Sequence, residues 1–87
     1  MKAATGKIEQ GEQTRARLVE VARTLFAERG YAGTSAEEIV RRAGVTRGAL
    51  YHHFDGKKNL FEQVFEEVEA EVIAEIAERM ADAQDAT

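Results

Sequence analysis

The feature that most constrains the fold is a tripeptide, Gly44-Val45-Thr46, that separates two short helical segments. Glycine suits the left-handed residue that ends a helix, and threonine is a favourable N-cap because its hydroxyl accepts from a backbone amide of the first turn. The earlier segment opens with Ser35-Ala36-Glu37-Glu38, which has the spacing of a capping box, with Glu38 expected to turn back to the serine amide. The sequence therefore predicts helices over 35–43 and 47–53 joined by a tight turn, the geometry of a helix-turn-helix.

Two longer helices are predicted on either side. The first covers 14–29, with Thr14 as its cap, Gly30 as its end, and an apolar face formed by Leu18, Ala22, Leu25 and Phe26. After Asp55-Gly56, a second apolar stripe follows the helical period for about six turns and predicts a helix over 57–81. No proline interrupts either pattern. The predicted class is all-α: a three-helix, homeodomain-like helix-turn-helix head followed by a long fourth helix.

The remaining segments set the domain boundaries. Residues 1–12 are small and polar, and we expect a flexible N-terminal arm; the head covers 13–56 and the long helix 57–81, with a polar tail over 82–87. The far end of the long helix has an apolar stripe that finds no partner in this chain: Val72, Ile73, Ile76 and Met80. Large unpaired apolar stripes are rare. We therefore expect this helix to lead into a further domain, or alternatively to associate with a second copy of itself.

Charge is unevenly divided along the chain. Residues 1–60 hold eleven Lys and Arg against seven Asp and Glu, whereas residues 61–87 hold one Arg against nine acids, for a net charge of −4. A basic front followed by an acidic helix favours a nucleic-acid partner weakly. The chain has no cysteine, so neither a disulfide framework nor a thiolate metal site is expected. No apolar run is long enough for a membrane span or a signal peptide, which predicts a cytoplasmic protein.

The outward face of the segment 47–53 is the principal candidate site. With Leu50 and Phe54 directed to the core, the residues left for a partner are Arg47, Gly48, Tyr51, His52 and His53. Arginine near the start of a recognition helix can bind guanine O6 and N7, while phenol and imidazole groups bind phosphates. The glycine is a poor helix former and fits a close approach of backbone to DNA, although it can also be a neutral surface substitution. Adjacent histidines diverge on a helix, so a shared metal ion is not expected.

Two helix starts are candidate phosphate sites. Lys57 and Lys58 have the wrong sign for a helix N-terminus, which a DNA phosphate would explain; ordinary solvated lysines are the alternative. Thr34 and Ser35 at the other start either bind phosphate or serve only as caps. The acids of the long helix are dispersed along a solvated face, and no nucleophile with a base, phosphate loop or metal-ligand spacing occurs. We expect no enzyme and no cofactor.

These residues together resemble the DNA-binding domain of the tetracycline-repressor (TetR) family over about residues 12–65. The residues that carry the resemblance are Gly33-Thr34-Ser35, Ile39, Ala43-Gly44-Val45-Thr46, Gly48, Leu50-Tyr51-His52-His53-Phe54, Lys57 and Leu60. The resemblance implies a ligand-responsive repressor that binds palindromic double-stranded DNA as a homodimer, with a small-molecule effector bound in a C-terminal domain. It implies DNA contacts at Ser35, Thr46, Arg47, Gly48, Tyr51, His52, His53 and Lys57.

Two positions depart from the family pattern. Ala36 and Glu37 occupy the first turn of the segment 35–43, where some relatives carry a hydroxyl or basic side chain that contacts DNA, and a glutamate there would repel phosphate. Asp55-Gly56 replaces a commoner Pro-Ser-like loop, with little expected consequence. The alternative function is a helical protein-interaction module that docks a partner through the apolar stripe of the long helix. A small enzyme is the second rival, and no residues support it.

Overall fold

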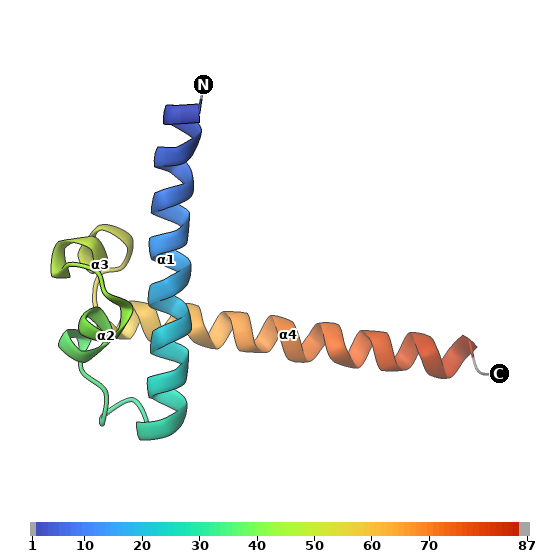
Figure 1. Ribbon diagram of the computed structural model, residues 1–87. Helices are drawn as coiled ribbons and strands as arrows, with labels where there is room; N and C mark the ends of the chain where they lie inside the picture. Colours follow the sequence, from blue (N-terminus) through green and yellow to red (C-terminus); the bar gives the residue numbers. More distant parts are fainter. Residues whose placement is uncertain (1, 86–87) are drawn as a thin grey trace.

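The computed structural model describes the backbone of residues 2–85 and the side chains of residues 11–84. This part of the chain is built from helices alone: α1 (Lys2–Arg29), α2 (Ala36–Ala43), α3 (Arg47–His53) and α4 (Lys57–Asp85). Figure 1 shows α2 and α3 lying together on one side of α1, while α4 crosses α1 and extends away from the other helices. The predicted all-α class, with a helix-turn-helix and a long fourth helix, is confirmed.

The predicted ends of the two short helices, and the predicted end of α1, are formed by the expected residues. The Ser35 hydroxyl accepts from the backbone amide of Glu38 at 3.1 Å, and the Thr46 hydroxyl accepts from the amide of Ala49 at the same distance. Gly30 and Gly44 have φ angles of 77° and 70°, the left-handed conformation that terminates a helix most readily at glycine. Local sequence therefore fixes where α2 and α3 begin and where α1 and α2 end.

The second half of the expected capping box is wrong. The carboxylate of Glu38 does not turn back to the serine amide but forms an ion pair with Arg29 at the end of α1. The guanidinium groups of Arg41 and Arg42 lie 3.9 and 3.7 Å from the same carboxylate. Three cations around one carboxylate are a stronger attraction than one neutral amide. The result is a cross-link between α1 and α2 that no local motif could reveal.

The boundaries of the two long helices also need correction. The predicted flexible arm over 1–12 lies within α1 from residue 2 onward, so Thr14 is inside a helix rather than at its cap. The predicted tail over 82–87 is helical as far as Asp85, which ends α4; Met1 and residues 86–87 lie outside the described residues. Adding one residue to an existing helix is far easier than starting one, and no proline stops either extension. Gly6 and Gly11 weaken a helix without breaking it.

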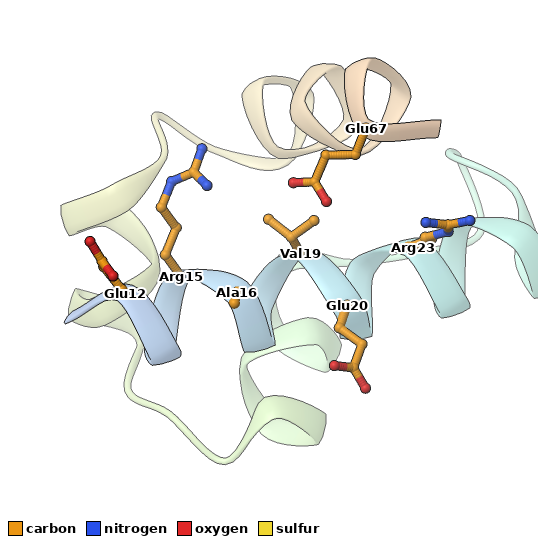
Figure 2. A pocket seen from close by; sticks show the side chains of 7 residues that line it. All are labelled: Glu12, Arg15, Ala16, Val19, Glu20, Arg23 and Glu67. Atoms are coloured by element: carbon orange, nitrogen blue, oxygen red, sulfur yellow. The ribbon is translucent and has the colours of Figure 1, made fainter. Parts of the chain in front are cut away.

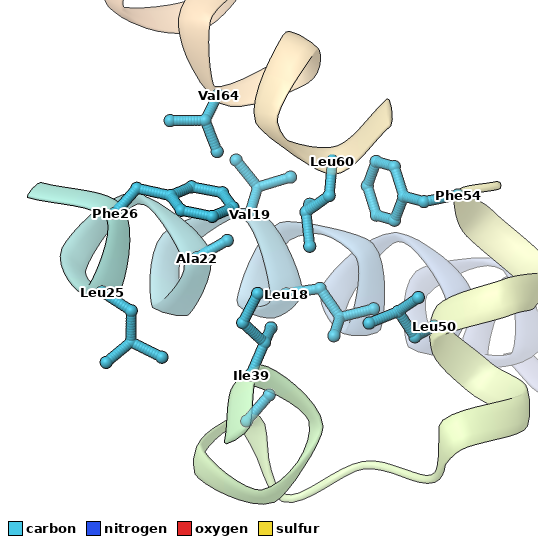
Figure 3. Close-up of a cluster of buried hydrophobic side chains, with 11 residues drawn as sticks. Leu18, Val19, Ala22, Leu25, Phe26, Ile39, Leu50, Phe54, Leu60 and Val64 are labelled. Carbon is cyan, nitrogen blue, oxygen red and sulfur yellow. The ribbon is translucent and has the colours of Figure 1, made fainter. Parts of the chain in front are cut away.

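The core lies where the four helices meet, and Figure 3 shows its side chains directed inward from each of them. The largest fully buried apolar side chains come from all four elements: Leu18, Leu25, Ile39, Leu50 and Leu60. Val19 is buried as well, because α4 covers a wider part of α1 than the predicted stripe suggested. The first turns of α4 thus belong to the same core as the helix-turn-helix.

The distal half of α4 has no covering element among the described residues. Its exposed large apolar side chains are Val72, Ile73, Ile76 and Met80, which are between 48% and 64% accessible. Phe65, nearer the start of α4, is also exposed at 55%. No side chain among residues 11–84 covers this stripe. One ion pair braces α4 against α1 before the stripe begins: Arg23 donates to both carboxylate oxygens of Glu71, at 2.6 and 2.9 Å.

Candidate nucleic-acid interface

The buried side of α3 fixes which side faces outward. Leu50 is fully buried and Phe54 is 4% exposed, and the Phe54 amide donates to the Leu50 carbonyl at 2.8 Å to close the last turn. Arg15 of α1 places its guanidinium 5.2 Å from the centre of the Phe54 ring, a cation–π contact that helps to hold that ring. Because the helix is only two turns long, two such anchors determine its rotation about its own axis.

The predicted recognition residues accordingly lie together on the surface. Arg47, Gly48, Tyr51 and His52 are exposed, and His53 is half-buried at the edge of this face. The Arg47 guanidinium lies 5.7 Å from the centre of the Tyr51 ring. The imidazole rings of His52 and His53 have their centres 5.0 Å apart. Five of the eight predicted site residues thus form one continuous face of α3 with donor groups at both ends.

The half-buried histidine differs electrically from its neighbour. Burial lowers the pKa of His53 below the ordinary value of 6.5, and the nearby charges of His52 and Arg15 lower it further. The ring is therefore predominantly neutral at pH 7, with one nitrogen able to donate and the other able to accept. Arg15 is a residue that the sequence reasoning missed. It precedes the apolar stripe of α1 by three positions, and only the fold brings it beside α3.

A shallow hollow separates the first turn of α2 from the outward face of α3. Its walls are Ala36, Glu37, Val40, Arg47 and Tyr51. The two small apolar side chains come from α2, while the cation and the aromatic ring come from α3. The carboxylate is exposed at the rim. The hollow brings a negative and a positive side chain together beside the recognition face.

The remaining three predicted contacts lie at helix starts. Ser35 and Thr46 are exposed, but each hydroxyl already accepts from an amide of its own helix. Thr34, offered as part of a phosphate site, is 1% exposed, and its hydroxyl donates to the carbonyls of Leu25 and Gly30 at 3.2 and 2.9 Å. That part of the hypothesis is wrong, because a buried hydroxyl with two internal partners cannot reach a phosphate.

Lys57 has an intramolecular partner in the folded chain. Its ammonium donates to the backbone carbonyl of Tyr31 at 2.9 Å and lies 4.1 Å from the centre of the Tyr31 ring. That ring packs edge-on against Phe61, with 5.1 Å between centres. A lysine at the start of α4 is therefore explained by the loop that follows α1, without reference to a phosphate. Lys58 is exposed and has no such contact in the described part of the chain.

A second hollow lies between α1 and α4, and Figure 2 shows its charged side chains arranged around Val19. Acids and arginines alternate along its walls: Glu12, Arg15, Glu20, Arg23 and Glu67, with Ala16 beside them. Within residues 11–84 no three histidines or acids are placed to hold a metal ion. The described helices include none that is long and apolar enough to cross a membrane. The recognition face remains the best-defined site in the structure.

Two short capped helices are joined here by a tight turn, and the second is anchored by its buried side so that its polar side is exposed. This arrangement defines a helix-turn-helix domain. The family described as bacterial regulatory proteins of the tetR family matches residues 18–64. The chain belongs to this family. The resemblance read from the sequence is thereby confirmed.

Individual relatives agree with this assignment. The HTH-type transcriptional regulator AcrR of Shigella flexneri is 43% identical over 56 residues, which are 64% of this chain and 26% of AcrR. The HTH-type transcriptional repressor KstR2 of Rhodococcus jostii is 44% identical over 58% of this chain and 24% of its own length. A solved TetR-family transcriptional regulator from Pectobacterium atrosepticum superimposes with a TM-score of 0.62 at 51% identity, over 72% of this chain and 33% of that one. The chain thus spans about a quarter of the length of these curated relatives.

Proposed function

We propose that this chain is the DNA-binding part of a transcriptional regulator, and specifically of a repressor. The single observation that carries the proposal is the outward face of α3, where Arg47, Tyr51 and His52 are exposed together on a helix anchored by Leu50. A short helix of this kind fits the major groove, which is wide enough to admit it. The relatives named as regulators and repressors supply independent support.

The proposed contacts divide into two groups. Arg47 and the neighbouring backbone at Gly48 read base edges, because they lie near the start of α3, where recognition helices meet bases. Tyr51, His52 and His53 bind phosphates or sugars and set the position of the helix in the groove. The exposed helix starts at Ser35 and Thr46 add backbone amides to the phosphate contacts.

Lys57 belongs to the proposal in a modified form. Its ammonium must exchange the Tyr31 carbonyl for a phosphate oxygen, or else share itself between the two. An ammonium has three donors, so a shared arrangement is chemically possible. The expected effect of the lysine on DNA affinity is therefore electrostatic and modest.

We further propose that the whole regulator is a cytoplasmic homodimer that binds a palindromic operator and releases it when a small molecule binds to a domain beyond this chain. Two recognition helices then occupy half-sites about one helical turn of DNA, or a multiple of it, apart. The exposed distal stripe of α4 (Val72, Ile73, Ile76, Met80) is the surface on which the further domain rests. Effector binding moves α4 and changes the separation of the two recognition helices.

Fluorescence anisotropy with labelled duplex DNA tests the proposal at low and moderate salt. Tyr51→Ala and Ile76→Ser are a matched pair, because both remove a large exposed side chain, 46% and 52% accessible, outside the core. We expect the first to weaken binding and the second to leave it unchanged. Loss of binding with Ile76→Ser alone, or no binding at low salt by two copies of the parent chain joined in tandem, would favour a protein-interaction module that works through α4.

A further inference from the structure

Glu37 is an unusual residue for the face on which it lies. It stands in the first turn of α2, is exposed, and shares the hollow with Arg47 and Tyr51 of α3. If this face approaches DNA, a carboxylate there faces a polyanion. An acid in that position is unfavourable unless it meets a donor that phosphates do not supply.

Among the residues whose side chains the structure describes, no cation pairs with Glu37. The residue best placed for pairing is Arg41, one helical turn further along α2. Its guanidinium instead lies 3.9 Å from the Glu38 carboxylate, which is directed toward α1. No ion pair involves Glu37 among residues 11–84. Its carboxylate oxygens are therefore available to accept hydrogen bonds from a partner.

Base edges in the major groove supply the missing donors. The N4 amino group of cytosine is a donor that glutamate accepts from, whereas thymine presents an oxygen acceptor at the same place. Arg47, on the opposite wall of the hollow, has the complementary preference for guanine. The two walls of the hollow thus match the two partners of a G·C pair or of neighbouring G·C pairs.

We infer that Glu37 is a specificity-determining residue that selects cytosine over thymine at a base position next to the one contacted by Arg47. The inference rests on the proposed function, since it applies only if α3 lies in the major groove. The role of this acid is then to reject wrong sequences. Next to thymine the carboxylate meets another hydrogen-bond acceptor, and next to a phosphate it meets a like charge, so both arrangements are unfavourable.

The test uses the 87-residue chain at micromolar concentration and low salt with a pool of duplexes randomised over 12 base pairs, about one turn of DNA, and sequences the bound fraction. We expect the parent chain to prefer cytosine over thymine about tenfold at one position. Glu37→Ala should abolish the preference there. Glu37→Gln should replace it with a preference for adenine, because an amide both donates to N7 and accepts from N6. Glu28→Gln, the same charge change on the exposed side of α1, is the control and should leave every preference intact.

The outcomes distinguish a failure of the inference about Glu37 from a failure of the proposed function. If all three variants bind every sequence more tightly and keep the parent's base preferences, Glu37 acts only through its charge and the inference is overturned. If the parent chain binds DNA with no preference at any position, specificity does not reside in this hollow and the inference is overturned as well. If two copies of the parent chain joined in tandem retain no DNA at low salt, the proposed function itself is refuted.

Discussion

Replacing Gly48 by alanine is expected to separate stability from DNA binding. The glycine lies in the first turn of α3 with an ordinary helical backbone, since only Gly30 and Gly44 have positive φ among the described residues. A Cβ added to it would have the Thr46 hydroxyl oxygen, 3.9 Å away, as its nearest neighbour, which is a normal contact. Glycine within a helix is less stable than alanine by about 0.5–1 kcal/mol. Gly48→Ala should therefore raise the melting temperature, by about 2–8 °C for a domain of this size.

The same methyl group should weaken DNA binding. It points from the outward face of α3 toward the proposed base contacts, so it holds the backbone away from the DNA. Loss of one backbone hydrogen bond to a base edge corresponds to about 0.5–1.5 kcal/mol, or about two- to tenfold in affinity. Circular dichroism at 222 nm during heating gives the stability, and anisotropy with a labelled duplex gives the affinity.

Gly44→Ala is the matched control for this prediction. A Cβ added to Gly44 would meet no atom within 4 Å, but the φ of 70° makes any side chain unfavourable by about 1–2 kcal/mol. We expect Gly44→Ala to melt at a lower temperature and Gly48→Ala at a higher one. If Gly48→Ala binds DNA as tightly as the parent chain, the close approach of backbone to DNA is wrong and the glycine is a neutral surface residue.

Three further changes test the division of roles. Arg47→Ala should weaken binding by about 1–3 kcal/mol and relax the preference at one base position in a binding selection; equal weakening on specific and random DNA would show that the arginine only positions the helix. Lys57→Ala should reduce the slope of log affinity against log salt concentration by about one unit at every DNA sequence, measured from 50 to 200 mM salt. An unchanged slope would show that the lysine contacts only Tyr31 and not a phosphate. The pKa of His53 is lowered in the folded chain, so the unfolded chain binds more protons between that pKa and 6.5. The free energy of unfolding should therefore fall as the pH drops below 6.5. Protonation of the same ring should strengthen DNA binding. His53→Asn should remove both parts of the pH dependence, and a pH profile that it leaves unaltered would contradict this role.

Features determined by neighbouring residues were predictable from the sequence. Ser35, Thr46 and Gly44 each act on the backbone within four positions, so their roles follow from residue type and spacing. The buried side of α3 was predictable for the same reason, since Leu50 and Phe54 are one helical turn apart. The composition of the recognition face then followed by exclusion.

Features that depend on distant residues were not predictable. The contact between Lys57 and Tyr31 joins positions 26 residues apart, and no local pattern specifies it. The choice of Glu38 between an amide of its own helix and Arg29 depends on how α1 and α2 pack. Thr34 resembled a surface hydroxyl in the sequence, yet it is buried, and its hydroxyl donates to carbonyls of Leu25 and Gly30 at the end of α1. In each case a short-range rule offered one partner and the tertiary structure supplied a better one.

The continuity of α4 has a mechanical consequence. Leu60 and Val64 fix its first turns in the core, and the same rigid rod continues for another 21 residues to Asp85, about 32 Å at 1.5 Å per residue. A tilt of about 5° around the buried end would displace the far end by about 3 Å. Read in reverse, a shift of that size imposed at the far end amounts to only a slight rotation at the core. The rigid α4 therefore scales motion down: a displacement of several ångströms at its distal end becomes a rotation of only a few degrees at the buried end that packs in the core.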